Sequence, residues 1–157
     1  RERVRQIKEK ALMRLCINDR ENAARYLAST DGIQGTFGHN VRVNWLFLNI
    51  ALNNGDNQEE LINFSSPAYD FFTRMSAFNS LAQLKIVNDQ VAENAFGTLL
   101  QGNRKLRNAG RDFIKTMSED ADAKKKFQLW VDRIGKLLSP EELASVEQLT
   151  GFIPGKN

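Results

Sequence analysis

The side chains that most often carry out chemistry are scarce in this sequence, which contains one histidine, His39, and one cysteine, Cys16. A zinc site needs several such ligands at close spacing, and a Ser-His-Asp or Cys-His site needs a nucleophile motif near the base. Neither pattern surrounds His39 or Cys16. We therefore expect no catalytic residue, no metal site and no cofactor, and we expect Cys16 to be a small buried hydrophobe.

A glycine-rich loop surrounds His39. It is predicted over residues 29–40, and it carries Gly32, Gly35 and Gly38. It lacks the Lys-Ser/Thr ending of a phosphate-binding P-loop, and no strand precedes it, so nucleotide binding is not favoured. Because long loops often carry function, Phe37 and His39 are predicted partner contacts, with Phe37 as the anchor.

Basic residues form a stripe on a predicted helix over residues 104–117. The members recur at positions i, i+3, i+7 and i+11, namely Arg104, Arg107, Arg111 and Lys115. Such a stripe would suit phosphates or an acidic partner. The net charge of +3 neither requires nor excludes nucleic acid. Acids such as Asp112 lie close in sequence, so a solvated surface of mixed charge is favoured over a nucleic-acid site.

The elements that must position these residues are predicted to be helices throughout. Apolar residues recur at spacings of three and four, and strand signals are nearly absent. About nine helices are predicted. The second begins at a cap, Asn18 or Asp19, and runs to residue 28. The others cover residues 4–17, 41–52, 58–64, 67–85, 90–100, 104–117, 121–138 and 140–149.

Several helix ends carry recognisable signals. Asn53-Asn54-Gly55 predicts a left-handed helix end, and Pro67 fits the first position of a helix. Further caps are predicted at Asn57 or Asp56, at Asn88 and Asp89, at Asn103, and at Ser118 to Asp120. Ser139, Pro140 and two glutamates predict a strong helix start, and Gly151 with Pro154 closes that helix.

Every other helix follows a weak common pattern with an arginine near its start. The arginines are Arg5, Arg42, Arg74 and Arg107, separated by 37 (5 to 42), 32 (42 to 74) and 33 (74 to 107) residues. An apolar residue follows each by ten positions, namely Leu15, Leu52, Leu84 and Met117. Ala77 and Gly110 are small residues three positions after the last two arginines, where Lys8 and Trp45 stand in the first two.

The physical role of this pattern follows from packing. A helical hairpin of this length does not bury its apolar face alone, but stacked hairpins bury a continuous core. Small residues let neighbouring helices approach closely. Asp70 and Asn103 each lie four residues before an arginine, so they are the predicted acceptors for Arg74 and Arg107.

These positions resemble the HEAT repeat, best over residues 70–100 and 103–138 and less closely over 41–64. The resemblance implies an all-α, right-handed stack of antiparallel helical hairpins, an armadillo-like α-solenoid, forming a single domain over residues 1–157. A non-repetitive helical bundle is the alternative. The resemblance also implies a non-catalytic scaffold whose concave surface binds another protein or another domain of the same chain. HEAT-like folds include DNA-base glycosylases, so a nucleic-acid-binding domain that uses the basic stripe is an alternative.

A narrower resemblance concerns residues 71–84 and 99–117, FFTRMSAFNSLAQL and LLQGNRKLRNAGRDFIKTM. They are similar to the C-terminal helical domain of gluzincin-type zinc aminopeptidases. That alternative implies a segment that closes the substrate chamber of a metallopeptidase. The paired-histidine zinc helix of such an enzyme is not in this sequence.

The ends and the hydropathy of the chain add two expectations. It begins at Arg1 within a helical pattern, so we expect a segment of a longer protein. The longest apolar stretch, residues 45–52, is far shorter than the roughly 20 residues that cross a bilayer, so no membrane contact is expected. The compartment is not fixed by the sequence, although a cytoplasmic location is slightly favoured.

Overall fold

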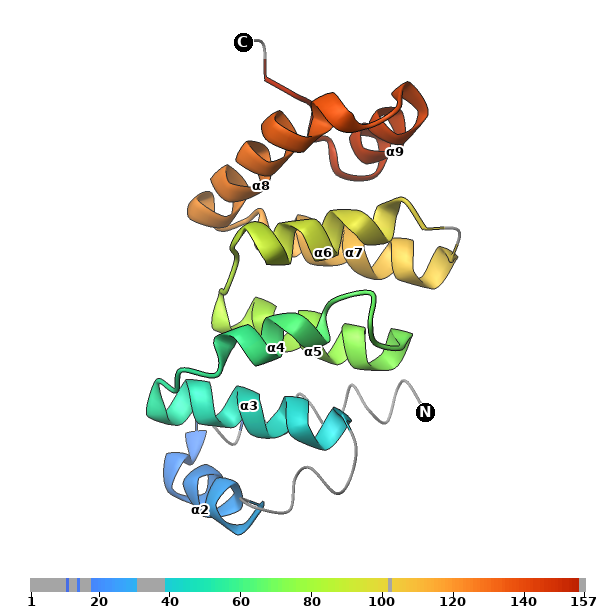
Figure 1. The fold of residues 1–157 in the computed structure, drawn as a ribbon. Coiled ribbons are helices and arrows are strands. Elements are labelled where there is room, and N and C mark those ends of the chain that lie inside the picture. Colours follow the sequence, from blue (N-terminus) through green and yellow to red (C-terminus); the bar gives the residue numbers. More distant parts are fainter. Residues whose placement is uncertain (1–10, 12–13, 15–17, 31–38, 102, 156–157) are drawn as a thin grey trace. The chain divides into compact units, whose positions relative to one another are not determined.

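The computed structural model describes residues 11, 14, 18–30, 39–101 and 103–155. These residues form eight α-helices and one short 3₁₀ turn, with no strand among them (Figure 1). The prediction of an all-α fold is therefore confirmed. The predicted helix over 4–17, with Arg5, Lys8 and Cys16, lies largely outside the described residues, as do Phe37 and the glycines of its loop.

The chain divides into two compact units, residues 1–80 and 81–157. The first unit contains α2 (Arg20–Thr30), α3 (His39–Asn53), α4 (Gln58–Phe64) and most of α5 (Phe71–Leu84). The second contains α6 (Asp89–Leu99), α7 (Arg104–Met117), α8 (Ala121–Ile134), the 3₁₀ turn η2 (Gly135–Leu137) and α9 (Pro140–Thr150). The single domain over residues 1–157 stays a prediction.

In the first unit, α3 packs against both α2 and α4. Its core-facing residues follow helical spacing, and Val43, Leu46 and Ile50 are all buried. Arg42 reinforces the contact with α4, because its Nε and Nη2 each donate to a carboxylate oxygen of Glu60 at 2.7 Å. The planar fork of an arginine matches a carboxylate in this two-bond geometry.

In the second unit, α6 contacts α7, α8 and α9, and Figure 1 shows α6 and α7 side by side. The centre of this core is aromatic. The Phe96 ring stacks on Trp130 with centroids 4.7 Å apart, and it meets Phe127 edge-on at 5.7 Å. Burying each such side chain stabilises the fold by about 2 kcal/mol.

The predicted helix caps are largely confirmed. Asn88, Asn103 and Asp120 each accept backbone N–H groups from the first turn of α6, α7 and α8. The left-handed end of α3 is also present, but Asn54 takes the positive φ of 50° and not Gly55. An asparagine tolerates that backbone region better than most residues, because its short side chain hydrogen-bonds locally.

The prediction that Pro67 opens a helix is wrong. Helix α5 begins four residues later, at Phe71. The reason is Asp70, whose carboxylate accepts the N–H of Phe72 at 3.2 Å and the hydroxyl of Thr73 at 2.6 Å. An aspartate in this position satisfies helix-start donors that would otherwise lack partners, so it fixes the start of the helix.

Two further boundaries differ from prediction. The helix expected to reach residue 138 ends at Ile134, and the chain tightens into η2 at Gly135. A Cβ at Gly135 would lie 3.0 Å from Cγ of Pro154, so the chain after α9 packs closely against this turn. His39, predicted in a loop, is instead the first residue of α3.

The predicted acceptors for the recurring arginines are also wrong. Asp70 and Asn103 cap their own helices. Arg74 Nε donates to the carbonyl oxygen of Ser65 at 2.9 Å, and Arg107 Nη1 donates to that of Gln101 at 2.9 Å. Both arginines therefore bind carbonyl groups that follow the preceding helix.

Candidate functional site

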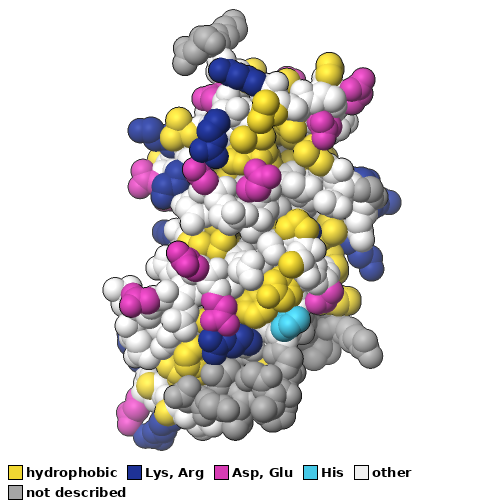
Figure 2. All heavy atoms as spheres, in the orientation of Figure 1, with side chains coloured by type: hydrophobic (Ala, Val, Ile, Leu, Met, Phe, Trp, Pro, Cys, Tyr) yellow, Lys and Arg dark blue, Asp and Glu magenta, His cyan; other side chains and the backbone are white. Residues whose placement is uncertain are grey.

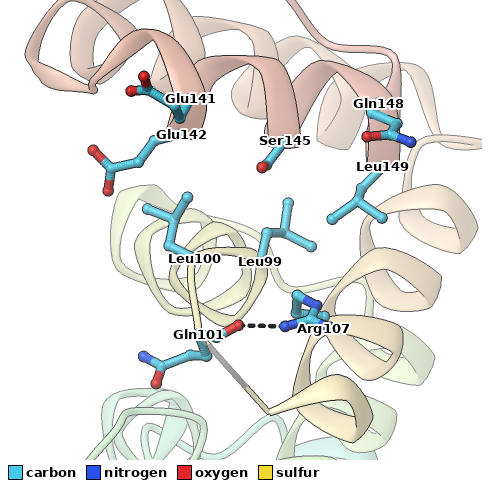
Figure 3. A pocket seen from close by; sticks show the side chains of 9 residues that line it. All are labelled: Leu99, Leu100, Gln101, Arg107, Glu141, Glu142, Ser145, Gln148 and Leu149. Atoms are coloured by element: carbon cyan, nitrogen blue, oxygen red, sulfur yellow. Dashed lines mark hydrogen bonds between the residues drawn. The ribbon is translucent and has the colours of Figure 1, made fainter.

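A pocket of the second unit lies where the end of α6 and the start of α7 face α9 (Figure 3). Its volume is about 400 Å³. The lining residues are Leu99, Leu100, Gln101, Arg107, Glu141, Glu142, Ser145, Gln148 and Leu149. Pockets that hold small ligands or side chains of partners begin at about this size.

Helix α9 forms one wall of the pocket, and its sequence fixes where the helix begins and ends. The Ser139 hydroxyl accepts the N–H of Glu142 at 3.1 Å, and the Glu142 carboxylate accepts the N–H of Ser139 at 3.0 Å. Pro140 occupies the first helical turn, and Gly151 ends the helix with a φ of 80°. This reciprocal cap confirms the start predicted from the sequence.

The other wall comes from the connection between α6 and α7. Asn103 caps α7, and Arg107 then reaches back to the carbonyl of Gln101. Farther along α7, Gly110 lies against α6 so closely that an added Cβ would fall 1.6 Å from Thr98 Oγ1. The small residue predicted at position 110 is therefore required by the packing of α6 on α7.

The centre of the pocket is apolar. Leu99 is buried, Leu149 is partly buried, and Leu100 is 36% exposed. Figure 3 shows Leu99 and Leu100 directed towards α9. An exposed leucine beside a buried one offers apolar surface that a partner side chain can cover.

Charged groups border this apolar centre on two sides. Figure 3 shows Glu141 and Glu142 on the α9 side and Arg107 on the side of the α6–α7 connection. The lining residues supply carboxylates, amides, one hydroxyl and one guanidinium, but neither histidine nor cysteine. The pocket therefore brings apolar, charged and hydrogen-bonding groups together.

The structure places the predicted contact residues in two separate groups. His39 belongs to the first unit, where its exposed ring lies 4.9 Å from the ring of Tyr69 and 5.5 Å from that of Phe64. Arg104, Arg107, Arg111 and Lys115 all lie on α7 in the second unit. Of these, Arg107 alone lines the pocket.

Two residues of the basic stripe bind other groups of the protein itself. Arg107 binds the carbonyl of Gln101, and Arg111 pairs with Asp112 at 3.2 Å. Arg104 and Lys115 are exposed. On the face drawn in Figure 2, lysine and arginine side chains are interspersed with aspartate and glutamate side chains. The bonds of Arg107 and Arg111 within the protein agree with a solvated surface better than with a phosphate-binding one.

Sequence reasoning missed the apolar part of the pocket. Leu99 and Leu100 lie around the end of α6, whereas Leu149 lies on α9, and no local spacing links residues so far apart in the sequence. One sequence signal at Leu100 indicated a contact surface. An apolar residue directly before the Gln-Gly-Asn turn is exposed to solvent unless another element covers it. Glu141 and Glu142 were assigned only to the helix start.

The described residues also bear on metal binding and on membrane insertion. No group of three or more His, Cys, Asp or Glu side chains in the described part of the chain could hold a metal ion. No helix in that part is both long enough and apolar enough to cross a membrane.

No protein-family model, curated protein or solved structure matches this chain. The resemblances to HEAT repeats and to the C-terminal domain of zinc aminopeptidases therefore stay predictions from the sequence.

Proposed function

We propose that this chain is a non-catalytic helical scaffold that binds another protein, or another domain of its own chain, through the pocket between α6, α7 and α9. The observation that carries the proposal is Leu100, an exposed leucine that continues the buried surface of Leu99 into an open pocket. A partner side chain seated there would remove apolar surface from water, which is the main source of association energy.

The scaffold is proposed to be HEAT-like, a right-handed stack of antiparallel hairpins. Support comes from the arginines 33 residues apart (74 to 107), which bind equivalent carbonyls after the preceding helix. Small-angle X-ray scattering tests the stack. A compact domain of this length has a radius of gyration of about 15 Å, so a stack requires a clearly larger value.

The binding function can be tested by photo-crosslinking from inside the pocket. A photoreactive amino acid replaces Ser145, which lines the pocket, in the full-length protein expressed in its own cells. The matched control places the same group at Ala144, the adjacent exposed residue of α9 that does not line it. We expect a covalent protein adduct from position 145 and none from 144. Equal labelling from both positions, or none from either, contradicts the proposal.

The two alternatives have separate tests. A nucleic-acid-binding domain requires oligonucleotide affinity that falls steeply with salt, and we expect none, because Arg107 and Arg111 bind groups of the protein itself. An aminopeptidase domain requires a His-Glu-x-x-His helix upstream in the same gene product, which sequencing of that product decides.

A further inference from the structure

The pocket between α6, α7 and α9 carries unbalanced negative charge. Helix α9 contains Glu141, Glu142 and Glu147 and no lysine or arginine. Arg107 is the one basic residue of the lining, and its Nη1 already donates to the carbonyl of Gln101. The Glu142 carboxylate accepts the N–H of Ser139. Glu141 is different, because none of the described residues lies within hydrogen-bond or ion-pair distance of its exposed carboxylate.

The two ends of the pocket also differ in chemistry. Its α9 wall consists of residues at positions i, i+1, i+4, i+7 and i+8, namely Glu141, Glu142, Ser145, Gln148 and Leu149. This stripe is about 12 Å long at the helical rise of 1.5 Å per residue, or roughly two helical turns. The charged end of the stripe is Glu141 and its apolar end is Leu149. Leu99, the last residue of α6, and Leu100, which follows it, face the stripe (Figure 3).

From this complementarity we infer that the pocket binds a short amphipathic, basic segment of a partner protein. An aliphatic side chain of the segment covers Leu100, and a lysine or arginine pairs with Glu141. Apolar anchors at helical spacing are how amphipathic helices occupy grooves of this kind. The acidic border would also repel segments that carry aspartate or glutamate at the same place, so charge would select among partners. The inference rests on the proposed function and specifies the chemistry of the partner.

Selection from a random peptide library tests it, with the full 157-residue chain as bait. Parallel selections use Leu100→Arg, which fills and charges the apolar centre, and Glu141→Arg, which reverses the charge of the border. We expect the wild-type chain to enrich peptides with aliphatic residues next to lysine or arginine. Leu100→Arg should lose them, and Glu141→Arg should enrich acidic residues in place of the basic ones. Circular dichroism confirms that both variants are folded.

The affinity of one selected peptide provides the quantitative test. Glu141→Gln should weaken it by about two- to fivefold, the range for an exposed ion pair, and the loss should shrink at high salt. Glu147→Gln is the matched control, because it removes the same charge from an exposed position of α9 outside the pocket, and it should leave the affinity unchanged.

The outcomes separate the two proposals. Peptides that bind wild type but not Leu100→Arg, without enrichment of lysine or arginine, overturn the inference about charge and leave the docking function standing. Equal effects of Glu141→Gln and Glu147→Gln overturn it as well. If Leu100→Arg selects the same peptides as wild type, the pocket is not the binding site and both proposals fail.

Discussion

Arg74 donates its Nε–H to the carbonyl oxygen of Ser65 at 2.9 Å, and both residues are buried. Ser65 is the residue that ends α4, so this bond ties the first turn of α5 to the backbone at the end of α4. Burial lowers the pKa of the Arg74 guanidinium below its ordinary value, although an arginine stays charged at neutral pH. Arg107 makes the equivalent bond to Gln101 from a partly exposed position.

The difference in burial predicts different costs for the same substitution. Arg74→Met should lower the free energy of unfolding by about 2 kcal/mol, because a buried carbonyl loses its charged donor. Arg107→Met should cost about 1 kcal/mol or less, since water can reach the exposed carbonyl of Gln101. Urea denaturation followed by circular dichroism measures both. Equal losses would show that burial of the acceptor does not decide the contribution.

Adding a methyl group at two helical glycines should have opposite effects on the stability of the protein. Gly110→Ala should destabilise by about 1–3 kcal/mol, because its Cβ would fall 1.6 Å from Thr98 Oγ1 and 2.8 Å from the carbonyl oxygen of Ala95. Gly97→Ala should stabilise by up to about 1 kcal/mol, because a Cβ there meets nothing within 4 Å and alanine favours the helix. Thermal unfolding of the two variants side by side tests this. A stable Gly110→Ala protein would mean that α6 and α7 separate at little cost.

The glycine pair also shows how far the sequence could predict the fold. The helices and most caps follow from local patterns, because a cap such as Asn103 needs only the next three residues to act. The small position at Gly110 was correctly predicted from the arginine pattern. Gly97 also lies inside a helix, but an added Cβ there has open space.

Other features of the fold could not be predicted in this way. The start of α5 depends on a competition between Pro67 and Asp70, which the hydrogen bonds of Asp70 decide. The acceptors of Arg74 and Arg107 are backbone carbonyls, which every residue has, so no side-chain pattern marks them. The pocket required the packing of α9 against α6, and sequence spacing does not report that contact.

Asp70 should make stability depend on pH. The Thr73 hydroxyl lowers the pKa of Asp70 below the ordinary value of an aspartate, and burial opposes this effect while the N–H groups of Thr73 and Phe72 add to it. A carboxylate with a lowered pKa in the folded state stabilises the protein above the unfolded pKa, and this stabilisation is lost as the pH falls through the folded value. Asp70→Ala should therefore cost about 1 kcal/mol at pH 7, as loss of a helix cap does.

Asp70→Asn separates the cap from the charge, because asparagine caps helices about as well but does not titrate. The stability difference between wild type and Asp70→Asn should shrink as the pH falls from about 5 to about 3, by less than about 1 kcal/mol because the carboxylate is exposed. Urea midpoints at several pH values measure it. A difference that stays constant across this range would mean that the charge of Asp70 contributes nothing.

The chain after α9 should hold the second unit together through Phe152. This residue is 7% exposed, and its ring centroid lies 6.0 Å from that of Phe96 and 6.1 Å from that of Phe127. Gln128 Nε2 donates to the carbonyl of the next residue, Ile153, at 2.7 Å. Phe152→Ala should therefore lower the free energy of unfolding by about 3 kcal/mol, because it leaves a cavity among aromatic rings.

Ile153→Ala is the matched control for Phe152→Ala. The Ile153 side chain is 47% exposed, and its hydrogen bond to Gln128 uses the backbone carbonyl, which the substitution keeps. Ile153→Ala should therefore change the free energy of unfolding by no more than about 0.5 kcal/mol. In a Trp45→Phe background, fluorescence of Trp130, which stacks on Phe96, reports unfolding of this unit and is compared with circular dichroism of the whole chain. If both variants lose the same small amount, the segment after α9 does not stabilise the core, and Phe152 packs there without holding α6 and α8 in place.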